Sequence, residues 1–360
     1  MEVRILNPSF EVVAVLDTFE SLIWTERYCG YGDFEIYTAV DPALMSFMVQ
    51  NNYVQKQGTT VLMIIEDVQI STDAEFGNRL TISGRSLESI LERRIVWEFM
   101  ALTGNVQDAI LDLLSHNILD TIFPLPARIV HALSTVYSFD PLVTAPTIEY
   151  QTHGDNLYEL IQAICSVNNL GFRISFEMNV GVAPFRFGVY SGADRSYEQE
   201  ANPYIVFSPT FENLISTNYL ESGRATKTVA LVAGEGEGLD TKLAYFPTTG
   251  GGEDLTRREL FVSASDITSN IEGGTMPIAT YNSHLRERGA EALDATFSPP
   301  IFEGQVESQV LFRYGEDYFL GDIVQLRNEY GMEARTRVTE VVTSVGLSGV
   351  EVYPTFSAIE

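Results

Sequence analysis

The amino-acid sequence predicts a mainly β protein with α+β elements, in which an α+β middle region joins two small antiparallel β-barrel domains. Three observations predict this fold class. Short apolar or alternating runs fill roughly the first ninety residues, two amphipathic segments and a hairpin pattern follow, and short runs return after Phe207. Closely spaced short strands with turn-forming residues between them are typical of small antiparallel barrels.

The first domain, residues 1–95, is expected to be a barrel because its apolar residues recur with the period of two of a half-buried strand. The segment Ser86–Arg94 places Leu87, Ile90 and Leu91 on one face behind a serine cap, which predicts a short helix. The expected strands are Val12–Leu16, Phe34–Val40, Tyr53–Gln57, Val61–Ser71 and Arg79–Gly84.

The middle domain, residues 96–204, changes to a helical period. Asn105–Asn117 and Asp155–Asn169 each repeat apolar residues three and four positions apart, which indicates two amphipathic helices. Asp155 is the expected N-cap of the second helix. The strands of the following hairpin are expected at Phe172–Met178 and Phe185–Gly192.

The last domain, residues 205–360, returns to β structure. Its expected strands are IVFSP, TVALVAG, RRELFVSA, QVLFRY, DIVQLR, ARTRVTEVVTSV and GVEVYPTF. A helical insertion is expected near residues 276–297, where YNSHLRERGAEALDA is rich in helix formers. Segments that start at Tyr53 and Asp322 share an order of Val-Gln, turn, long strand, loop and strand. This internal repeat predicts one barrel element used twice.

Composition limits the function classes. The 360-residue chain carries 49 acidic and 22 basic residues, a formal net charge of −27. A protein that grips DNA through its phosphates needs basic clusters, so this charge argues against that class. The charge suits a surface that repels nucleic acid, and solubility alone would also explain it. We expect neither a membrane span nor a secretion signal, because no apolar run has the required length.

The cysteines and histidines show no spacing typical of a metal site or of a disulfide scaffold. Cys29 and Cys165 are isolated, which excludes a disulfide scaffold and a Cys-x-x-Cys site. The four histidines are scattered along the chain, with no metal-ligand spacing between them. We therefore expect no metal and no cofactor.

The run VAGEGEG, Val232–Gly238, resembles a phosphate-binding loop because glycines follow a strand. It lacks GK[ST] and GxGxxG, and no helical pattern follows it. Glu235 and Glu237 would repel a phosphate. We expect an acidic turn instead, with a structural role.

An enzymatic site is not expected either. Neighbouring acids such as Glu316 and Asp317 cannot supply the spacing that a glycosidase needs across its cleft, and so many acids produce such pairs by chance. The run nearest to G-x-S-x-G, Ile82–Ser86, lacks the second glycine. No Ser or Cys has a histidine partner in the sequence pattern.

Several blocks, in this order, resemble a known family. They are YGDFEIY, GRSLESILERRIV, VFSPTFENLIST, TVALVAGEGEG with RREL, YGEDYFLGDIVQLR and RVTEVV. Together they are similar to the tail-tip hub proteins of long-tailed, siphovirus-type bacteriophages, the Tal-like or baseplate-hub group. The resemblance extends from about Ile5 to Phe356.

This resemblance implies a structural virion protein made in the bacterial host cytoplasm, and no enzyme. It implies two tail-tube-like barrels per chain and a homotrimeric ring that matches the six-fold tail tube and lets DNA pass during ejection. The implied partners are the distal tail protein, tail tube, tail fibre or receptor-binding proteins and the tape measure protein, with genomic DNA in transit only. It also implies a hub without a fibre or enzymatic domain after Glu360.

Acidic loops at Glu235, Glu237, Glu316 and Asp317 are the candidates for channel-facing or interface-facing sites. The alternatives are a virion-associated cell-wall glycan hydrolase, with distant carboxylates meeting in a pocket, or a carbohydrate-binding module with exposed aromatic platforms.

Overall fold

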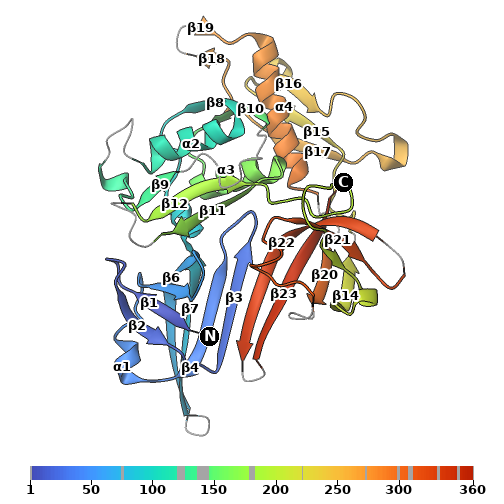
Figure 1. Cartoon of the computed structure of the whole chain (residues 1–360). Coiled ribbons are helices and arrows are strands. Elements are labelled where there is room, and N and C mark those ends of the chain that lie inside the picture. Colours follow the sequence, from blue (N-terminus) through green and yellow to red (C-terminus); the bar gives the residue numbers. More distant parts are fainter. Residues whose placement is uncertain are drawn as a thin grey trace.

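One large β-sheet supports the rest of the molecule in the computed structural model. The structure describes residues 2–73, 77–119, 126–135, 146–177, 183–220, 222–271, 274–297, 301–306, 311–330, 333–346 and 349–359. Within these residues the sheet has thirteen strands, and the middle region and an inserted unit lie together beyond one end of the strands, above both halves (Figure 1).

The first half of the sheet comes from the N-terminal part of the chain and runs in the order β3-β4-β7-β6-β5-β1-β2. Apolar and polar residues alternate along these strands, as in a sheet with one buried face. Leu22 and Trp24 of β3 and Phe34 of β4 point into the core, and their neighbours along each strand are more exposed. The elements are β1 (Val3–Leu6), β2 (Val12–Leu16), β3 (Ser21–Arg27), β4 (Asp33–Ala39), α1 (Pro42–Met45), β5 (Tyr53–Lys56), β6 (Leu62–Asp73) and β7 (Gly77–Ser86).

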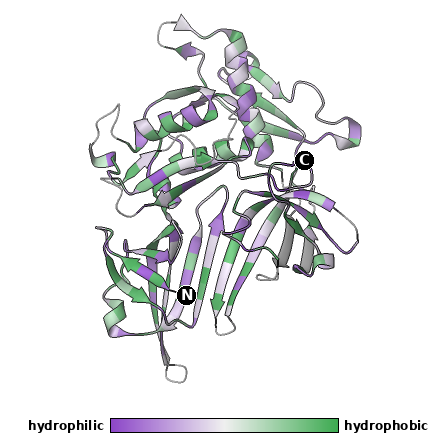
Figure 2. Ribbon diagram, in the orientation of Figure 1, coloured by the Kyte–Doolittle hydropathy of each residue, from purple (hydrophilic) through white to green (hydrophobic). Residues whose placement is uncertain are grey.

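The second half of the sheet comes from the C-terminal part and runs in the order β14-β20-β23-β22-β21-β13. Its core gathers Phe207, Val324 and Phe356, all fully buried. The hydrophilic and hydrophobic residues alternate along its long strands (Figure 2). The elements are β13 (Val206–Phe207), a 3₁₀ turn (Pro209–Phe211), β14 (Leu214–Leu220), β20 (Ile301–Val306), β21 (Ile323–Arg327), β22 (Glu333–Gly346) and β23 (Gly349–Ala358).

The two halves are joined, which corrects the expectation of two separate closed barrels. Residues Glu340–Val345 of β22 pair with Leu22–Arg27 of β3 in antiparallel register. In the described residues, no strand pairing closes either half on itself. An open sheet edge leaves backbone N–H and C=O groups unpaired, and the joint satisfies these groups on β3 and β22. The coarser prediction, a mainly β protein with helical elements, is confirmed.

The two halves repeat one strand order. β3, β4, β7, β6, β5 and β1 correspond to β14, β20, β23, β22, β21 and β13. One difference is that β1 pairs antiparallel with β5, whereas β13 pairs parallel with β21. Matching rows of paired residues cross four strands, Ile65–Gly84–Phe34–Trp24 in the first half and Val338–Phe356–Phe302–Tyr219 in the second.

The repeat includes a β-bulge. The pairing register of β6 shifts between Ile65 and Asp67, and that of β22 shifts between Val338 and Glu340. A residue with positive φ precedes the corresponding strands β5 and β21, Asn51 at 67° and Gly321 at 92°. Their N–H groups donate to the carbonyls of Ile65 and Val338 at 2.9 and 2.8 Å. Tyr53 thus corresponds to Ile323. The sequence repeat was expected to start at Tyr53 and Asp322, so its second start lies one residue later than expected.

The middle region packs two helices between small sheets. Asn156 caps α3 through its side chain, which corrects Asp155, and the expected helix at Ser86–Arg94 is a 3₁₀ helix, Leu87–Arg93. The hairpin β11–β12 is confirmed, although its turn partly lies outside the described residues. The elements are β8 (Met100–Asn105), α2 (Val106–Asn117), a 3₁₀ turn (Pro126–Arg128), β9 (Leu133–Thr135), β10 (Thr147–Thr152), α3 (Leu157–Val167), β11 (Gly171–Phe176) and β12 (Phe185–Tyr190).

The inserted unit lies between β14 and β20, where the first half has only the short β3–β4 connection. TVALVAG and RRELFVSA therefore form no part of the large sheet: they supply β15 and β17 of a separate three-stranded sheet covered by α4. Its elements are β15 (Val229–Ala233), a 3₁₀ turn (Gly238–Asp240), β16 (Leu243–Phe246), a 3₁₀ turn (Asp254–Thr256), β17 (Glu259–Ser263), β18 (Asn270–Ile271), β19 (Gly274–Thr275) and α4 (Ile278–Asp294). The expected strand QVLFRY lies partly outside the described residues.

Candidate functional site

The halves and the middle region meet around Tyr28, the residue after β3. Its hydroxyl donates to the carbonyl of Asn169 at 2.9 Å and accepts from Nη1 of Arg337 at 3.1 Å. The Arg337 guanidinium also lies 4.9 Å from the centroid of the Tyr28 ring. Arg337, on β22, donates further to the carbonyls of Ser191 and Gly321. Burial raises the pKa of Tyr28, so its hydroxyl stays protonated at neutral pH.

Two glycines make room for the Tyr28 ring. A Cβ on Gly171 would lie 2.4 Å from Cε2 of Tyr28, and a Cβ on Gly321 would lie 2.5 Å from the same atom. No side chain fits at either position without moving the ring. The close contact therefore fixes β11 and the start of the β21 segment against the end of β3.

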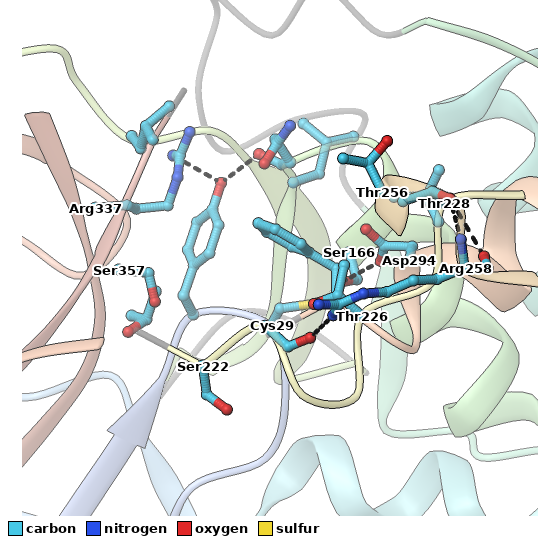
Figure 3. Close-up of a pocket in the computed structure, with 18 of the residues that line it drawn as sticks. Cys29, Ser166, Ser222, Thr226, Thr228, Thr256, Arg258, Asp294, Arg337 and Ser357 are labelled. Carbon is cyan, nitrogen blue, oxygen red and sulfur yellow. Dashed lines mark hydrogen bonds between the residues drawn. The ribbon is translucent and has the colours of Figure 1, made fainter. Parts of the chain in front are cut away.

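A cavity of about 1010 Å³ opens beside this junction. Figure 3 shows its polar wall, which comes from all four parts of the fold: Cys29, Ser166, Ser222, Thr226, Thr228, Thr256, Arg258, Asp294, Arg337 and Ser357. Burial, and then the charge of Asp294, raises the pKa of Cys29 to about 12, so the thiol stays protonated and unreactive. Among the described residues of this wall none is a histidine, so it holds no Ser–His or Cys–His pair.

Charged side chains follow the joint between β3 and β22. Nε of Arg27 lies 2.6 Å from Oε2 of Glu340, and Nη1 of Arg27 lies 2.5 Å from Oδ2 of Asp33. Glu26 accepts from the Tyr314 hydroxyl of the second half at 3.2 Å. The joint is thus held by side chains as well as by its backbone ladder.

Glu235 is anchored within the inserted unit rather than presented as a free acid. Its carboxylate pairs with Nζ of Lys242 at 2.5 Å and accepts from the Ser269 hydroxyl and, at 3.0 Å, the Ser269 N–H. These contacts, led by Lys242, lower the pKa of Glu235 to about 2. The N–H of Glu235 donates to the Tyr281 hydroxyl of α4. Its interactions tie the loop to α4 and to the segment before β18.

Glu237, Glu316 and Asp317 are exposed. Glu316 lies 3.5 Å from Arg313, and the Asp317 carboxylate accepts from the Arg313 N–H at 2.8 Å. Glu237 belongs to the inserted unit, whereas Glu316 and Asp317 lie in the turn before β21. The candidate acids therefore belong to two different units.

A buried carboxyl group lies where α4 meets the middle region. Burial raises the pKa of Glu291 to about 8, against the opposing effect of Arg288, and Glu287 and Asp155 raise it further. Arg288 lies 3.9 Å from Glu291 and 5.1 Å from the ring centroid of Tyr150 on β10. The contact between α4 and β10 thus contains an acid that prefers its neutral form near neutral pH.

Sequence analysis missed Tyr28 and Arg337. Tyr28 lies between the expected strands Val12–Leu16 and Phe34–Val40, where no element was predicted, and Arg337 lies in an alternating strand where its position gives no functional signal. Across the described residues, no group of three or more His, Cys, Asp or Glu side chains is placed to hold a metal ion. No helix in the described part of the chain has the length and apolar character to cross a membrane.

Comparisons with known proteins give one consistent result. A family model described as Siphovirus ReqiPepy6 Gp37-like protein matches residues 2–356. No curated protein sequence matches the chain. The fold is similar to that of the tail protein from Neisseria meningitidis MC58, with a TM-score of 0.58 and 13% identity over 99% of this chain and 95% of that one.

Two further solved structures have the same fold. Prophage tail protein gp18 from Listeria monocytogenes EGD-e has a TM-score of 0.55 and 14% identity over 99% of this chain and 94% of that one. The 43 kDa tail protein of prophage MuSo2 from Shewanella oneidensis has a TM-score of 0.54 and 14% identity over 99% and 98%. The predicted resemblance to bacteriophage tail proteins is confirmed.

Proposed function

The chain belongs to the Siphovirus ReqiPepy6 Gp37-like protein family, and on this premise we propose that it is the structural hub of a phage tail tip or baseplate. Three copies form a ring that continues the tail tube, and DNA passes through the ring during infection. The protein is a virion component without catalytic activity. Its neighbours are the distal tail protein, the tail tube, fibre or receptor-binding proteins and the tape measure protein.

The repeated strand order is the observation that carries this proposal. One chain presents two β units of the same order, and three copies present six, which suits a six-fold tube above the ring. In the ring, these two open β units, which belong to residues 1–95 and 205–360, take the place of the expected barrels, with residues 96–204 between them. The likeness in fold to phage tail proteins supports the same assignment.

The cavity gives no support to a cell-wall glycan hydrolase. Glycosidases place two carboxyl groups on either side of the scissile bond. Among the described residues of the cavity wall, Asp294 is the one carboxylate, and it accepts from the Ser166 hydroxyl at 3.2 Å. A carbohydrate-binding module would use exposed aromatic residues, of which Tyr245 and Phe261 lie on either side of Leu231 in the inserted unit.

Negative-stain imaging of the purified chain, together with its mass in solution, tests the proposal. We expect particles with three-fold symmetry and a central opening. A strict monomer at all concentrations, or an assembly without a central opening, would contradict the proposed function.

A further inference from the structure

The pairing of β22 with β3 has an equivalent pair of strands in the repeat, and these two strands are not paired with each other within one chain. In the repeat, β22 corresponds to β6 and β3 corresponds to β14, so the equivalent joint would pair β6 with β14. Within the described residues, the outer part of β6, residues 67–72, pairs with β7 alone. β14 likewise pairs with β20 and forms one end of the sheet.

Burial distinguishes the joint that is made from the one that is open. Val341 of β22 is 1% exposed, whereas its counterpart Val68 of β6 is 37% exposed. Thr25 of β3 is 4% exposed, whereas its counterpart Leu220 of β14 is 55% exposed. Both strands of the open joint thus expose apolar side chains at positions whose counterparts are buried at the joint that is made.

A second copy of the chain offers the missing partner of each strand. β14 and β6 belong to one sheet, and six strands lie between them: β20, β23, β22, β3, β4 and β7. Within the described residues of one copy they do not pair, and the six strands between them hold them on opposite sides of the joint. The two strands also fit a like-charged neighbour, because residues 67–72 include one charged side chain, Asp67, and β14 includes none.

We propose that β6 residues 67–72 of one copy pair antiparallel with β14 of the next copy, in the register of the β22–β3 joint. Thr343 lies opposite Trp24 in that joint. Their counterparts are Ile70 and Tyr219, so Ile70 lies opposite Tyr219 of the neighbouring molecule. Residues directly opposite in an antiparallel pair have Cβ atoms about 4.5–5.5 Å apart. The proposal rests on the ring proposed above and adds the contact that closes it.

Cysteine pairs test this register under mild oxidation. The variant Ile70→Cys with Tyr219→Cys is expected to form a disulfide between subunits, seen as covalent dimers and trimers on non-reducing gels. A mismatched variant, Ile70→Cys with Leu220→Cys, shifts one cysteine to the opposite face of β14, and the crosslinked fraction should fall at least about tenfold. Ser344→Cys with Ile23→Cys is the positive control, because these residues pair within one chain.

The outcomes separate this contact from the hub assignment. Crosslinking of the matched pair alone supports both. Rings that form without this crosslink, or that crosslink the mismatched pair equally, overturn the β6–β14 register and leave the hub in place. A protein that remains monomeric, while Ser344→Cys with Ile23→Cys still forms its internal disulfide, overturns the ring as well.

Discussion

The Nη1 atom of Arg337 lies 3.1 Å from the hydroxyl oxygen of Tyr28, so a residue of β22 holds the first residue after β3. This contact also reaches the middle region, because the Tyr28 hydroxyl donates to Asn169 and Arg337 donates to Ser191. The position of the middle region and the joint between the halves are therefore linked through the pair of Tyr28, which is buried, and Arg337, which is half-buried.

Tyr28→Phe should lower the free energy of unfolding by about 1–2 kcal/mol, because it leaves buried hydrogen-bonding groups without their partner. Arg337→Ala should cost more, since it also removes the cation over the ring. Thermal unfolding measures both. Tyr330→Phe is the matched control, as Tyr330 is 82% exposed, and equal losses at both tyrosines would contradict this account.

Glu235→Gln should destabilise the inserted unit at neutral pH by about 1–2 kcal/mol. The pKa of Glu235 is lowered from 4.5 to about 2, so the folded state favours the carboxylate. Its contribution is complete above about pH 4.5 and disappears as the pH falls towards 2. Proteolysis of the unit at several pH values measures this, with Glu237→Gln as the control in the same loop. A difference that persists at pH 2 would argue against the ion pair as its cause.

Glu291→Gln should stabilise the protein at alkaline pH. The pKa of Glu291 is raised from 4.5 to about 8, so the folded state favours the protonated acid. Its stabilising contribution is complete below about pH 4.5 and is lost as the pH rises to 8, at up to about 1.4 kcal/mol per pH unit. Unfolding midpoints from pH 5 to 9 measure the difference. Midpoints of variant and parent that stay parallel over this range would contradict the burial argument.

Added salt should favour assembly. Each chain carries a net charge of −27, so copies repel one another at low ionic strength. Raising the salt from about 0.01 M to about 1 M shortens the Debye length from about 30 Å to about 3 Å, which screens this repulsion. Analytical ultracentrifugation should show the ring fraction increasing. Dissociation by salt would instead indicate an interface dominated by opposite charges.

Acids on the ring axis should ease DNA passage, because basic residues would bind its phosphates. If Glu316 and Asp317 face the channel, changing both to Lys should slow DNA ejection several-fold near physiological salt and have less effect at high salt. Glu11→Lys is the control on an exposed acid of the first half. An unchanged ejection rate would leave solubility as the explanation of the net charge at these positions.

The periodic patterns predicted much of the local structure. The alternation in Phe34–Val40 and the apolar stripe of Asn105–Asn117 each follow from a single element, so they can be recognised in one sequence. The Val-Gln repeat also marked the corresponding strands β5 and β21. The boundaries were less certain: Asn156 and Asp155 are both good caps, and only the backbone geometry decides between them.

The joint and the inserted unit could not be predicted in this way. Pairing between β3 and β22 depends on an edge that each half leaves open. The hydrophobic period of a single strand does not show which other strand will pair with it. β15 and β17 have the same alternation as strands of the large sheet, so sequence alone assigned them to it. Glu235 has the composition of a solvated acid, and its partners Lys242 and Ser269 come from beyond the loop.

The joint between β3 and β22 also governs how the protein is made. Arg27 and Glu340 are 313 residues apart, so β3 leaves the ribosome long before its partner strand exists. At roughly 5–20 residues per second, the β3 edge stays open for on the order of tens of seconds. An open edge of this kind recruits strands from other nascent chains. Fragments that end before β22 are therefore expected to aggregate and, when co-expressed, to interfere with folding of the complete protein.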